Sequence, residues 1–458
     1  MLASNGALLD TLRTALGADA VLAGDAVDPR YASDSTRINA CAPAAVVRPR
    51  STAEVAAVLR ACHAAAQPIV VQGGLTGLAG GATPRAGEIA LSLERLTGVE
   101  AVDVDSGTLT VRAGTPLQAV HEEAARHGLQ FALDLGARGS CTIGGNISTN
   151  AGGNRVIRYG MTRELVLGLE AVLADGTVLS AMNTMMKNNT GYDLKQLFVG
   201  SEGTLGVVTR AVLRLHPAPR ERLTAMLAVP SFAKLVTVLR EARSALGGQL
   251  GSFEALWSDY YEFAVEKSLG GKRPFAETHP LYALIELEAL DAQIDTGRLE
   301  TLLEQLLASG AAVDAVVARS FADSARLWRI RESAGELFAY VKPIVAYDVS
   351  VPIEAMEHYL ARLAREAAQL IGEWPLFVFG HLGDGNLHIV ASPRDARALD
   401  GVVYGALAGI GSVSAEHGIG VLKRPYLGTS RTPSELELMR RLKATLDPRN
   451  ILNPGRVL

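Results

Sequence analysis

The sequence predicts an α+β fold built as more than one domain. From about residue 40 to residue 217, short apolar runs of strand length alternate with helix-length segments and glycine-rich turns. Beyond residue 220, longer amphipathic helices alternate with β-branched runs. A chain of 458 residues has room for about two to four domains of ~100–200 residues each. We therefore expect a first domain of α+β or α/β type and a second α+β domain, with an antiparallel sheet that carries its helices on one face.

The composition is that of a globular protein and excludes several functional classes. A net charge of −4 gives no electrostatic attraction to nucleic acid. None of the three cysteines (Cys41, Cys62, Cys141) has CxxC spacing, so neither a disulfide framework nor a thiolate zinc site is predicted. The first residues form an amphipathic pattern rather than a signal peptide, and no segment reaches the ~20 apolar residues of a membrane-spanning helix. A cytoplasmic location is expected, with peripheral membrane attachment left open.

The first domain opens with clear local signals. Ser51 and Glu54 spell a capping box ahead of an Ala/Val/Leu helix that runs to about Ala66. The other elements expected here are a buried strand at 68–72, strands at 88–93 and 107–114, and a helix at 116–127.

The second domain carries longer elements. A helix is expected after Pro352, because apolar residues recur on one of its faces through Leu370. Strands are expected at 281–289 and 313–319. The closing segment, LDPRNILNPGRVL, contains two Pro/Asn turns, which indicates a docked end.

Three glycine-rich blocks interrupt the first domain, at 73–84, 134–154 and 191–217. Glycine lets backbone N–H groups approach a phosphate closely, because no Cβ intervenes. The first block lacks GxGxxG spacing and is not followed by a helix start, which argues against a Rossmann turn. The second has almost no helical periodicity and adds short hydroxyl and amide groups. One block alone could equally be a tight turn, but three in one domain favour a large polar cofactor.

The order of these blocks is distinctive. QGGLTGLAGG, DLGARGSCTIGGNISTNAGGNRVIRYG, NNTGYDLKQLFVGSEGTLG and ILNPGRVL closely resemble the FAD-linked oxidases of the vanillyl-alcohol-oxidase type, in the D-2-hydroxyacid dehydrogenase branch that includes D-2-hydroxyglutarate and D-lactate dehydrogenases. The resemblance runs from about residue 40 to the end. It implies a two-subdomain FAD-binding domain (1–219), a substrate or cap domain with a metal site (220–420), and a C-terminal segment that returns to the FAD domain (421–458).

The resemblance also implies which residues hold the flavin. The first two blocks would bind the pyrophosphate and line the flavin, Gly203 and Val207 would lie near the adenine, and Asn453 would return to the isoalloxazine. Family members with covalent flavin carry a histidine in the first glycine loop, which has none here, so non-covalent FAD is expected. The expected cofactor-binding residues are Gln72, Gly73, Gly74, Leu75, Thr76, Gly77, Gly80, Asp134, Gly136, Ser140, Thr142, Gly144, Gly145, Asn146, Thr149, Gly152, Gly153, Gly203, Val207 and Asn453.

The stretch FGHLGDGNLH places His381 and His388 around a Gly-Asp-Gly turn, and SAEHGIG adds Glu416. Two imidazoles and a carboxylate suit zinc or a similar divalent ion with positions left for substrate. Each histidine alone is more simply a turn residue, but three of the nine histidines lie between 381 and 417 beside a glutamate. The resemblance places the metal ligands on His381, His388 and Glu416.

His417 resembles the active-site base of the family, and Arg331 matches the arginine that binds a substrate carboxylate. Oxidation of an α-hydroxy acid needs such a base, because the hydroxyl proton leaves while the C2 hydrogen passes to flavin N5 as hydride. Arginine suits a carboxylate because its donors are bidentate.

The substrate pocket departs from the 2-hydroxyglutarate enzymes of the family. Where those enzymes carry a threonine, a lysine and an asparagine, this chain has Gly335, Ala346 and Val390. A second substrate carboxylate would lack partners there, which favours an uncharged side chain, as in D-lactate, longer aliphatic D-2-hydroxy acids or D-mandelate. The alternatives are a D-2-hydroxyglutarate dehydrogenase, a metallohydrolase that uses the two histidines and Glu416, and a flavoprotein that only transfers electrons. The family favours quinone or electron-transfer flavoprotein as electron acceptor, and a homodimer is a further expectation.

Overall fold

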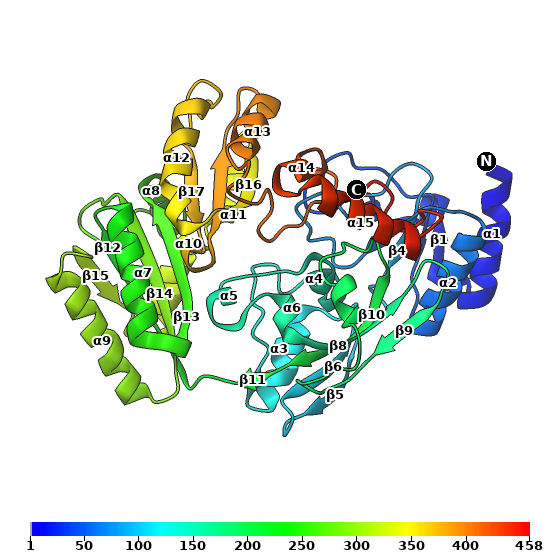
Figure 1. The fold of residues 1–458 in the computed structure, drawn as a ribbon, viewed down its shortest axis with the longest axis horizontal. Helices are drawn as coiled ribbons and strands as arrows, with labels where there is room; N and C mark the ends of the chain where they lie inside the picture. Colours follow the sequence, from blue (N-terminus) through cyan, green and yellow to red (C-terminus); the bar gives the residue numbers. More distant parts are fainter. Residues whose placement is uncertain (1) are drawn as a thin grey trace. The chain divides into compact units, whose positions relative to one another are not determined.

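The computed structural model describes residues 2–458, which form two compact units (Figure 1). Unit 1 contains the chain up to Gly153, Gly160–Ala218 and Glu416–Leu458. Unit 2 contains Asn154–Tyr159 and Pro219–Ala415. The C-terminal segment therefore returns to the unit in which the chain begins.

Unit 1 contains a small sheet in the order β1-β2-β4-β3, in which β2 and β3 run parallel to β4. Helix α2 begins where the capping-box spelling predicts, because the Ser51 side chain accepts a hydrogen bond from Glu54 N (3.2 Å). The elements are α1 (Leu2–Leu16), β1 (Val21–Ala23), β2 (Ala45–Val47), α2 (Thr52–Ala64), β3 (Ile69–Gln72) and β4 (Ile89–Ser92).

A second sheet of unit 1 is antiparallel, in the order β5-β6-β10-β8-β9. The presence of both sheets and helices in this unit confirms the predicted α+β class. The elements are β5 (Val99–Asp103), β6 (Thr108–Arg112), α3 (Leu117–Arg126), β7 (Leu129–Gln130), α4 (Ile143–Thr149), α6 (Thr162–Leu165), β8 (Val166–Val172), β9 (Val178–Ala181), β10 (Val207–Arg214), β11 (His216–Pro217), α14 (Leu427–Ser430) and α15 (Pro433–Leu446).

Helix α4 lies inside the second glycine block, where the sequence shows almost no helical periodicity. Thr142 caps this short helix, because its Oγ1 accepts a hydrogen bond from Gly145 N (3.4 Å). A Cβ on Gly144 would lie 2.7 Å from the Cβ of Ala113. Glycine is thus used here to bring a helix against the end of β6, and the apolar periodicity that usually reveals a helix is missing.

Unit 2 is built on a seven-stranded sheet in the order β15-β12-β14-β13-β17-β18-β16. Every neighbouring pair is antiparallel, as predicted. The strands are β12 (Glu221–Val229), β13 (Leu250–Trp257), β14 (Leu281–Ala289), β15 (Asp314–Val317), β16 (Val345–Ser350), β17 (Phe377–Gly380) and β18 (Asn386–Ala391).

The prediction that this sheet carries helices on one face only is wrong. Every residue of β14 is buried, so the strand is covered on both sides. Helices α7 and α9 pack together and against β14, whereas α8, α10 and α11 cover the opposite face (Figure 1). The continuous apolar run LYALI already has the pattern of a strand buried on both faces. The helices are α5 (Val156–Tyr159), α7 (Phe232–Leu246), α8 (Ser258–Leu269), α9 (Ala292–Ala308), α10 (Phe321–Arg331), α11 (Ala334–Tyr340), α12 (Ile353–Ala367) and α13 (Ala396–Gly405).

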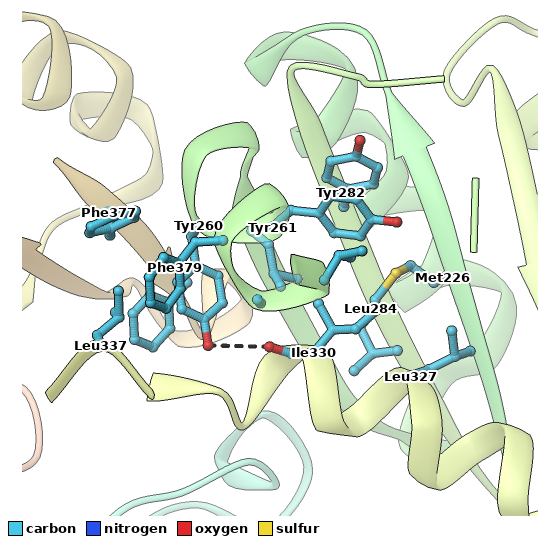
Figure 2. Close-up of a cluster of buried hydrophobic side chains, with 14 of the residues drawn as sticks. Met226, Tyr260, Tyr261, Tyr282, Leu284, Leu327, Ile330, Leu337, Phe377 and Phe379 are labelled. Carbon is cyan, nitrogen blue, oxygen red and sulfur yellow. Dashed lines mark hydrogen bonds between the residues drawn. The ribbon is translucent and has the colours of Figure 1, made fainter. Parts of the chain in front are cut away.

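An aromatic cluster fills the core under α8 and α10 (Figure 2). The rings of Tyr260 and Phe379 stack with their centroids 4.0 Å apart. The Tyr260 hydroxyl donates to the carbonyls of Ile330 (3.3 Å, dashed in Figure 2) and Arg331 (2.8 Å). The core therefore holds the last turn of α10, which carries Arg331, in a fixed place.

Across residues 2–458, no helix combines the length and the apolar character that crossing a membrane requires.

Candidate cofactor and metal sites

The three glycine blocks meet at the end of β3 in unit 1. Gln72 is buried, and its Nε2 donates to the carbonyls of Tyr31 and Ala82 (2.9 Å each), which closes the first glycine loop on itself. A Cβ on Gly74 would lie 1.9 Å from the carbonyl oxygen of Ser140, in the second block. A Cβ on Gly203, in the third block, would lie 3.5 Å from Val71 on β3. Residues more than 60 positions apart in sequence are thus brought into one place.

Some glycines of these blocks are needed because the chain packs tightly against them, not because a ligand approaches their backbone. A Cβ on Gly73 would lie 2.5 Å from Thr142 Oγ1, and one on Gly153 (φ 146°) would lie 2.0 Å from the Asp134 carbonyl oxygen. Gly136 and Gly139 differ, because they are exposed and a Cβ on either would find no neighbour within 4 Å among residues 2–458. The backbone at these two positions is accessible to a ligand.

The buried polar groups near the blocks also fit a polar cofactor. Thr142, Asn146 and Thr149 form local hydrogen bonds within and before α4. The Gln72 Oε1 atom, in contrast, is buried and has no hydrogen-bond partner within the part of the chain that the structure describes. A buried acceptor of this kind calls for a donor from outside the chain, since an unpaired one is costly. FAD has amide and hydroxyl donors of the kind that would satisfy this need.

Asn453 holds the C-terminal segment against β3 and the third block. Its Oδ1 accepts a hydrogen bond from Val71 N (2.8 Å), and its Nδ2 donates to the Glu202 carbonyl (2.7 Å). These two hydrogen bonds tie the C-terminal segment to unit 1, and the predicted contact of Asn453 with the flavin stays a prediction. The same holds for the other expected cofactor residues, which lie after β3 (Leu75, Thr76, Gly77, Gly80), in the second block (Asp134, Ser140, Gly145, Gly152) and at the start of β10 (Val207).

Glu202 fixes the segment that follows His417. Its carboxylate accepts hydrogen bonds from the N–H groups of Ile419 (2.7 Å) and Gly420 (2.8 Å). Glu202 itself has a left-handed backbone conformation (φ 51°), which non-glycine residues rarely adopt. The sequence analysis missed this residue, although it is the one charged residue in the turn GSEGTLG.

His381 and His388 flank a tight turn of unit 2. Residue 381 follows β17, and His388 lies on β18 directly opposite Phe379. Gly385 takes a positive φ of 83°, which reverses the chain. The turn brings the two imidazole rings together, with their centroids 5.5 Å apart.

Glu416 and His417 follow a segment that is hydrogen-bonded to β16. Ser412 exchanges backbone hydrogen bonds with Ser350 (2.8 and 3.1 Å), and Ala415 N donates to the Asp348 carbonyl (3.3 Å). One ligand atom each of His381, His388 and Glu416 lie within 4.8 Å of one another. Nitrogen and carboxylate donors at this spacing suit one zinc-like ion.

Asp348 is a second acidic residue at this site, and the sequence analysis missed it. It lies opposite His388 on β16, and one ligand atom each of Asp348, His388 and His417 again lie within 4.8 Å of one another. Its Oδ1 accepts a hydrogen bond from Asn386 Nδ2 (2.7 Å). A lone acid in the apolar strand VAYDVS was the available signal.

Glu254 is the third residue that the sequence analysis missed. It is fully buried on β13, one of its oxygens is 2.6 Å from His381 Nδ1, and the other accepts from Arg331 Nε (2.5 Å). Burial alone would raise the pKa of Glu254, but the charges of Arg331 and His381 hold it below its ordinary value. Glu254 is therefore a carboxylate that contacts both a predicted metal ligand and the predicted substrate arginine.

The three predicted pocket positions have no polar side-chain atoms. Gly335 is exposed at the start of α11, and Ala346 is exposed on β16 directly opposite Val390. Val390 is 2% exposed and belongs to the aromatic core cluster. It also lies two residues from His388 on the same strand, so both side chains point to the same face of the sheet.

Two protein-domain models match most of the chain. A model described as "FAD binding domain" matches residues 43–181, and one described as "FAD linked oxidases, C-terminal domain" matches residues 218–457. The chain is 43% identical to a D-2-hydroxyglutarate dehydrogenase of Xanthomonas citri pv. viticola, over 93% of this chain and 92% of that protein. It is 43% identical to the mitochondrial D-2-hydroxyglutarate dehydrogenase of Bos taurus (90% and 76%) and 36% identical to a putative mitochondrial D-lactate dehydrogenase of Schizosaccharomyces pombe (89% and 80%).

Solved structures share the fold at low sequence identity. p-Cresol methylhydroxylase superposes with a TM-score of 0.78 at 16% identity, covering 100% of this chain and 97% of that one. Alkyldihydroxyacetonephosphate synthase superposes with a TM-score of 0.75 at 18% identity, covering 98% and 84%. These likenesses confirm the predicted fold of the vanillyl-alcohol-oxidase type.

Proposed function

This chain belongs to the FAD-linked oxidases, and from that membership we propose that it oxidises a D-2-hydroxy acid to the 2-oxo acid, with a preference for substrates that have an uncharged side chain. The observation that carries the proposal is the meeting of His381, His388 and Glu416 beside His417. Unit 1 would hold FAD non-covalently, since residues 73–84 contain no histidine, and unit 2 would bind the substrate.

Five residues of the site have roles in this reaction. When bound, FAD supplies a hydride acceptor, and a zinc-like ion held by His381, His388 and Glu416 supplies a Lewis acid that lowers the hydroxyl pKa. His417 accepts the hydroxyl proton on an imidazole nitrogen. Arg331 binds the substrate carboxylate through paired N–H groups. Arg331 therefore orients C2. Because His417 takes the hydroxyl proton, no positive charge builds up on the hydroxyl oxygen when hydride leaves C2.

The preference for uncharged side chains rests on Gly335, Ala346 and Val390. A distal carboxylate that loses its water without gaining donors pays a desolvation penalty, and these three side chains offer no donor. The second candidate function is D-2-hydroxyglutarate oxidation, which the names of the most similar relatives favour. The two candidates share their chemistry and differ only in this pocket.

A substrate panel separates the two candidates. We expect kcat/KM for D-lactate, D-2-hydroxybutyrate or D-mandelate to exceed that for D-2-hydroxyglutarate. The triple variant Gly335→Thr, Ala346→Lys, Val390→Asn restores the polar groups of the family and should raise the relative kcat/KM for D-2-hydroxyglutarate about 10- to 100-fold, because a charged hydrogen bond contributes about 1.5–3 kcal/mol. If the unaltered enzyme prefers D-2-hydroxyglutarate, the proposed specificity is wrong while the oxidation itself stands.

The remaining parts of the proposal have simple tests. Acid precipitation should release yellow flavin into the supernatant, whereas a yellow pellet would show a covalent bond. A quinone analogue or an electron-transfer flavoprotein should reoxidise the reduced enzyme faster than dioxygen does. Light scattering should give the mass of a dimer. Metal analysis of the purified protein should find about one divalent ion per chain.

A further inference from the structure

We propose that Glu254 is a positioning residue that fixes both the metal-binding atom of His381 and the guanidinium of Arg331. One buried carboxylate then sets the geometry for two different tasks, metal binding and substrate binding. The inference rests on the proposed function for the identity of the ion and of the substrate. Its residue contacts lie entirely within unit 2.

The sheet places Glu254 next to His381. Strands β13 and β17 pair with Ala255 opposite Gly380 and Leu256 opposite Phe379. Continuing this antiparallel register puts position 254 opposite position 381, where Cβ atoms are neighbours. A fully buried carboxylate in the apolar strand LGSFEALW is costly unless charged partners compensate for the lost water. Glu254 has two such partners.

The contact with His381 selects one imidazole tautomer. The Nδ1 atom lies 2.6 Å from Glu254 Oε1. Because an ionised carboxylate only accepts hydrogen bonds, Nδ1 carries the hydrogen and Nε2 carries the lone pair. Arg331 Nη2 lies 3.3 Å from that Nε2 and can only donate, which requires the same tautomer in the metal-free protein; a bound ion would take this lone pair in place of Arg331. His381 is thus held with Nε2 as its ligand atom, in the carboxylate–histidine–metal arrangement.

The contact with Arg331 fixes the guanidinium. Its Nε donates to Glu254 Oε2 (2.5 Å), and its carbonyl accepts from the Tyr260 hydroxyl (2.8 Å). The ring of Phe379 lies below the guanidinium, with the Cζ atom 5.0 Å from the ring centroid. The side chain is only 9% exposed. A planar group held from these directions has little rotational freedom left to lose when a carboxylate binds.

The test compares Glu254→Ala with Glu286→Gln as a matched control. Glu286 is also a buried carboxylate of this sheet (5% exposed), but it accepts from Trp328 Nε1 (3.0 Å) and lies on β14. Zinc affinity is measured by competition with a chromogenic chelator on FAD-loaded protein. We expect Glu254→Ala to bind zinc about 10- to 100-fold more weakly than wild type, the usual effect of losing such a partner, and Glu286→Gln to bind as wild type does. Unchanged zinc affinity in Glu254→Ala overturns the proposal.

A second variant and a metal-free readout cover a failure of Glu254→Ala to fold. Glutamine at 254 keeps only one acceptor atom. Glu254→Gln should therefore either bind zinc about 10-fold or more weakly or have a KM for D-lactate about 10-fold or more higher, depending on which partner its oxygen faces. Nitrogen-15 NMR of histidine-labelled, metal-free wild type should show His381 protonated at Nδ1. Protonation at Nε2 overturns the tautomer assignment. If wild type binds no zinc yet D-lactate reduces its flavin, the metal role of Glu254 is refuted while the proposed oxidation survives.

Discussion

Replacing Gly74 by alanine tests whether the glycine blocks are packed backbone to backbone. The added Cβ would lie 1.9 Å from the Ser140 carbonyl oxygen, 2.8 Å from its carbon and 3.0 Å from Cys141 Cα. All three neighbours are backbone atoms, so no side-chain rotation relieves the clash. The first and second blocks must therefore separate. Gly136→Ala is the matched control, because its Cβ would meet no atom within 4 Å among residues 2–458 and its φ is not positive.

The expected magnitude follows from that geometry. A normal contact between a methyl carbon and an oxygen needs more than 3 Å, so the loops must move apart by over 1 Å. Forcing a methyl group into a well-packed site costs about 1–3 kcal/mol. For a unit of this size, about 1 kcal/mol shifts the unfolding midpoint by roughly 2–4 °C. We expect Gly74→Ala to lower Tm by about 2–12 °C, whereas Gly136→Ala should leave it within about 2 °C.

The assay combines thermal unfolding with FAD titration of the flavin-depleted protein. Gly74→Ala should lose both stability and FAD affinity, because it separates the loops that are predicted to bind the cofactor. Gly136→Ala should lose FAD affinity without loss of stability if the cofactor approaches the backbone there. Equal stability of Gly74→Ala and wild type would refute the packing argument. Equal destabilisation by both variants would refute the distinction between packing glycines and ligand-facing ones.

Three further predictions follow from single contacts. His417→Ala should keep its FAD but reduce it about 10²–10⁴-fold more slowly in rapid mixing, and an unchanged rate would exclude it as the base. Arg456 Nη2 contacts the buried Glu88 carboxylate at 2.7 Å, so Arg456→Met leaves this carboxylate without its ion-pair partner. The variant should lower the free energy of unfolding in urea by about 3–5 kcal/mol, and adding Glu88→Gln should restore part of it. A thiol reagent at pH 8 should modify the partly exposed Cys41 in the native protein but not Cys62. Burial raises the pKa of Cys62 to about 12, so its reactive thiolate forms only near that pH. Rapid labelling of Cys62 would contradict this.

Local signals in the sequence predicted local structure well. The Ser51 and Glu54 pair marked the start of α2, and the apolar periodicity after Pro352 marked α12 (Ile353–Ala367). Both depend on neighbours within four residues, which the sequence displays directly. The seven-residue helix α4 was missed because glycines replace the apolar stripe that normally reveals a helix. Helices on both faces of the unit 2 sheet were missed although the apolar run LYALI in β14 has the pattern of a strand buried on both faces, because which helices cover each face depends on partners far away in sequence.

At the site, too, some residues could be predicted from the sequence and others could not. His381, His388 and Glu416 were identified as possible ligands from their residue types and from the family resemblance, and the structure brings them together. Glu254 and Asp348 were not identified, because their roles arise from strand register rather than from spacing along the chain. A single charged residue inside an apolar strand is the signal that could have identified both.

The most direct test of the central claim is anaerobic reduction of the bound flavin by D- and L-2-hydroxy acids. The proposed chemistry predicts that D-enantiomers bleach the flavin absorbance and that L-enantiomers do not. It also predicts that prior treatment with a metal chelator slows the bleaching and that adding back zinc restores it. A flavin that no D-2-hydroxy acid bleaches, in protein that retains its FAD and its metal, would contradict the proposed function.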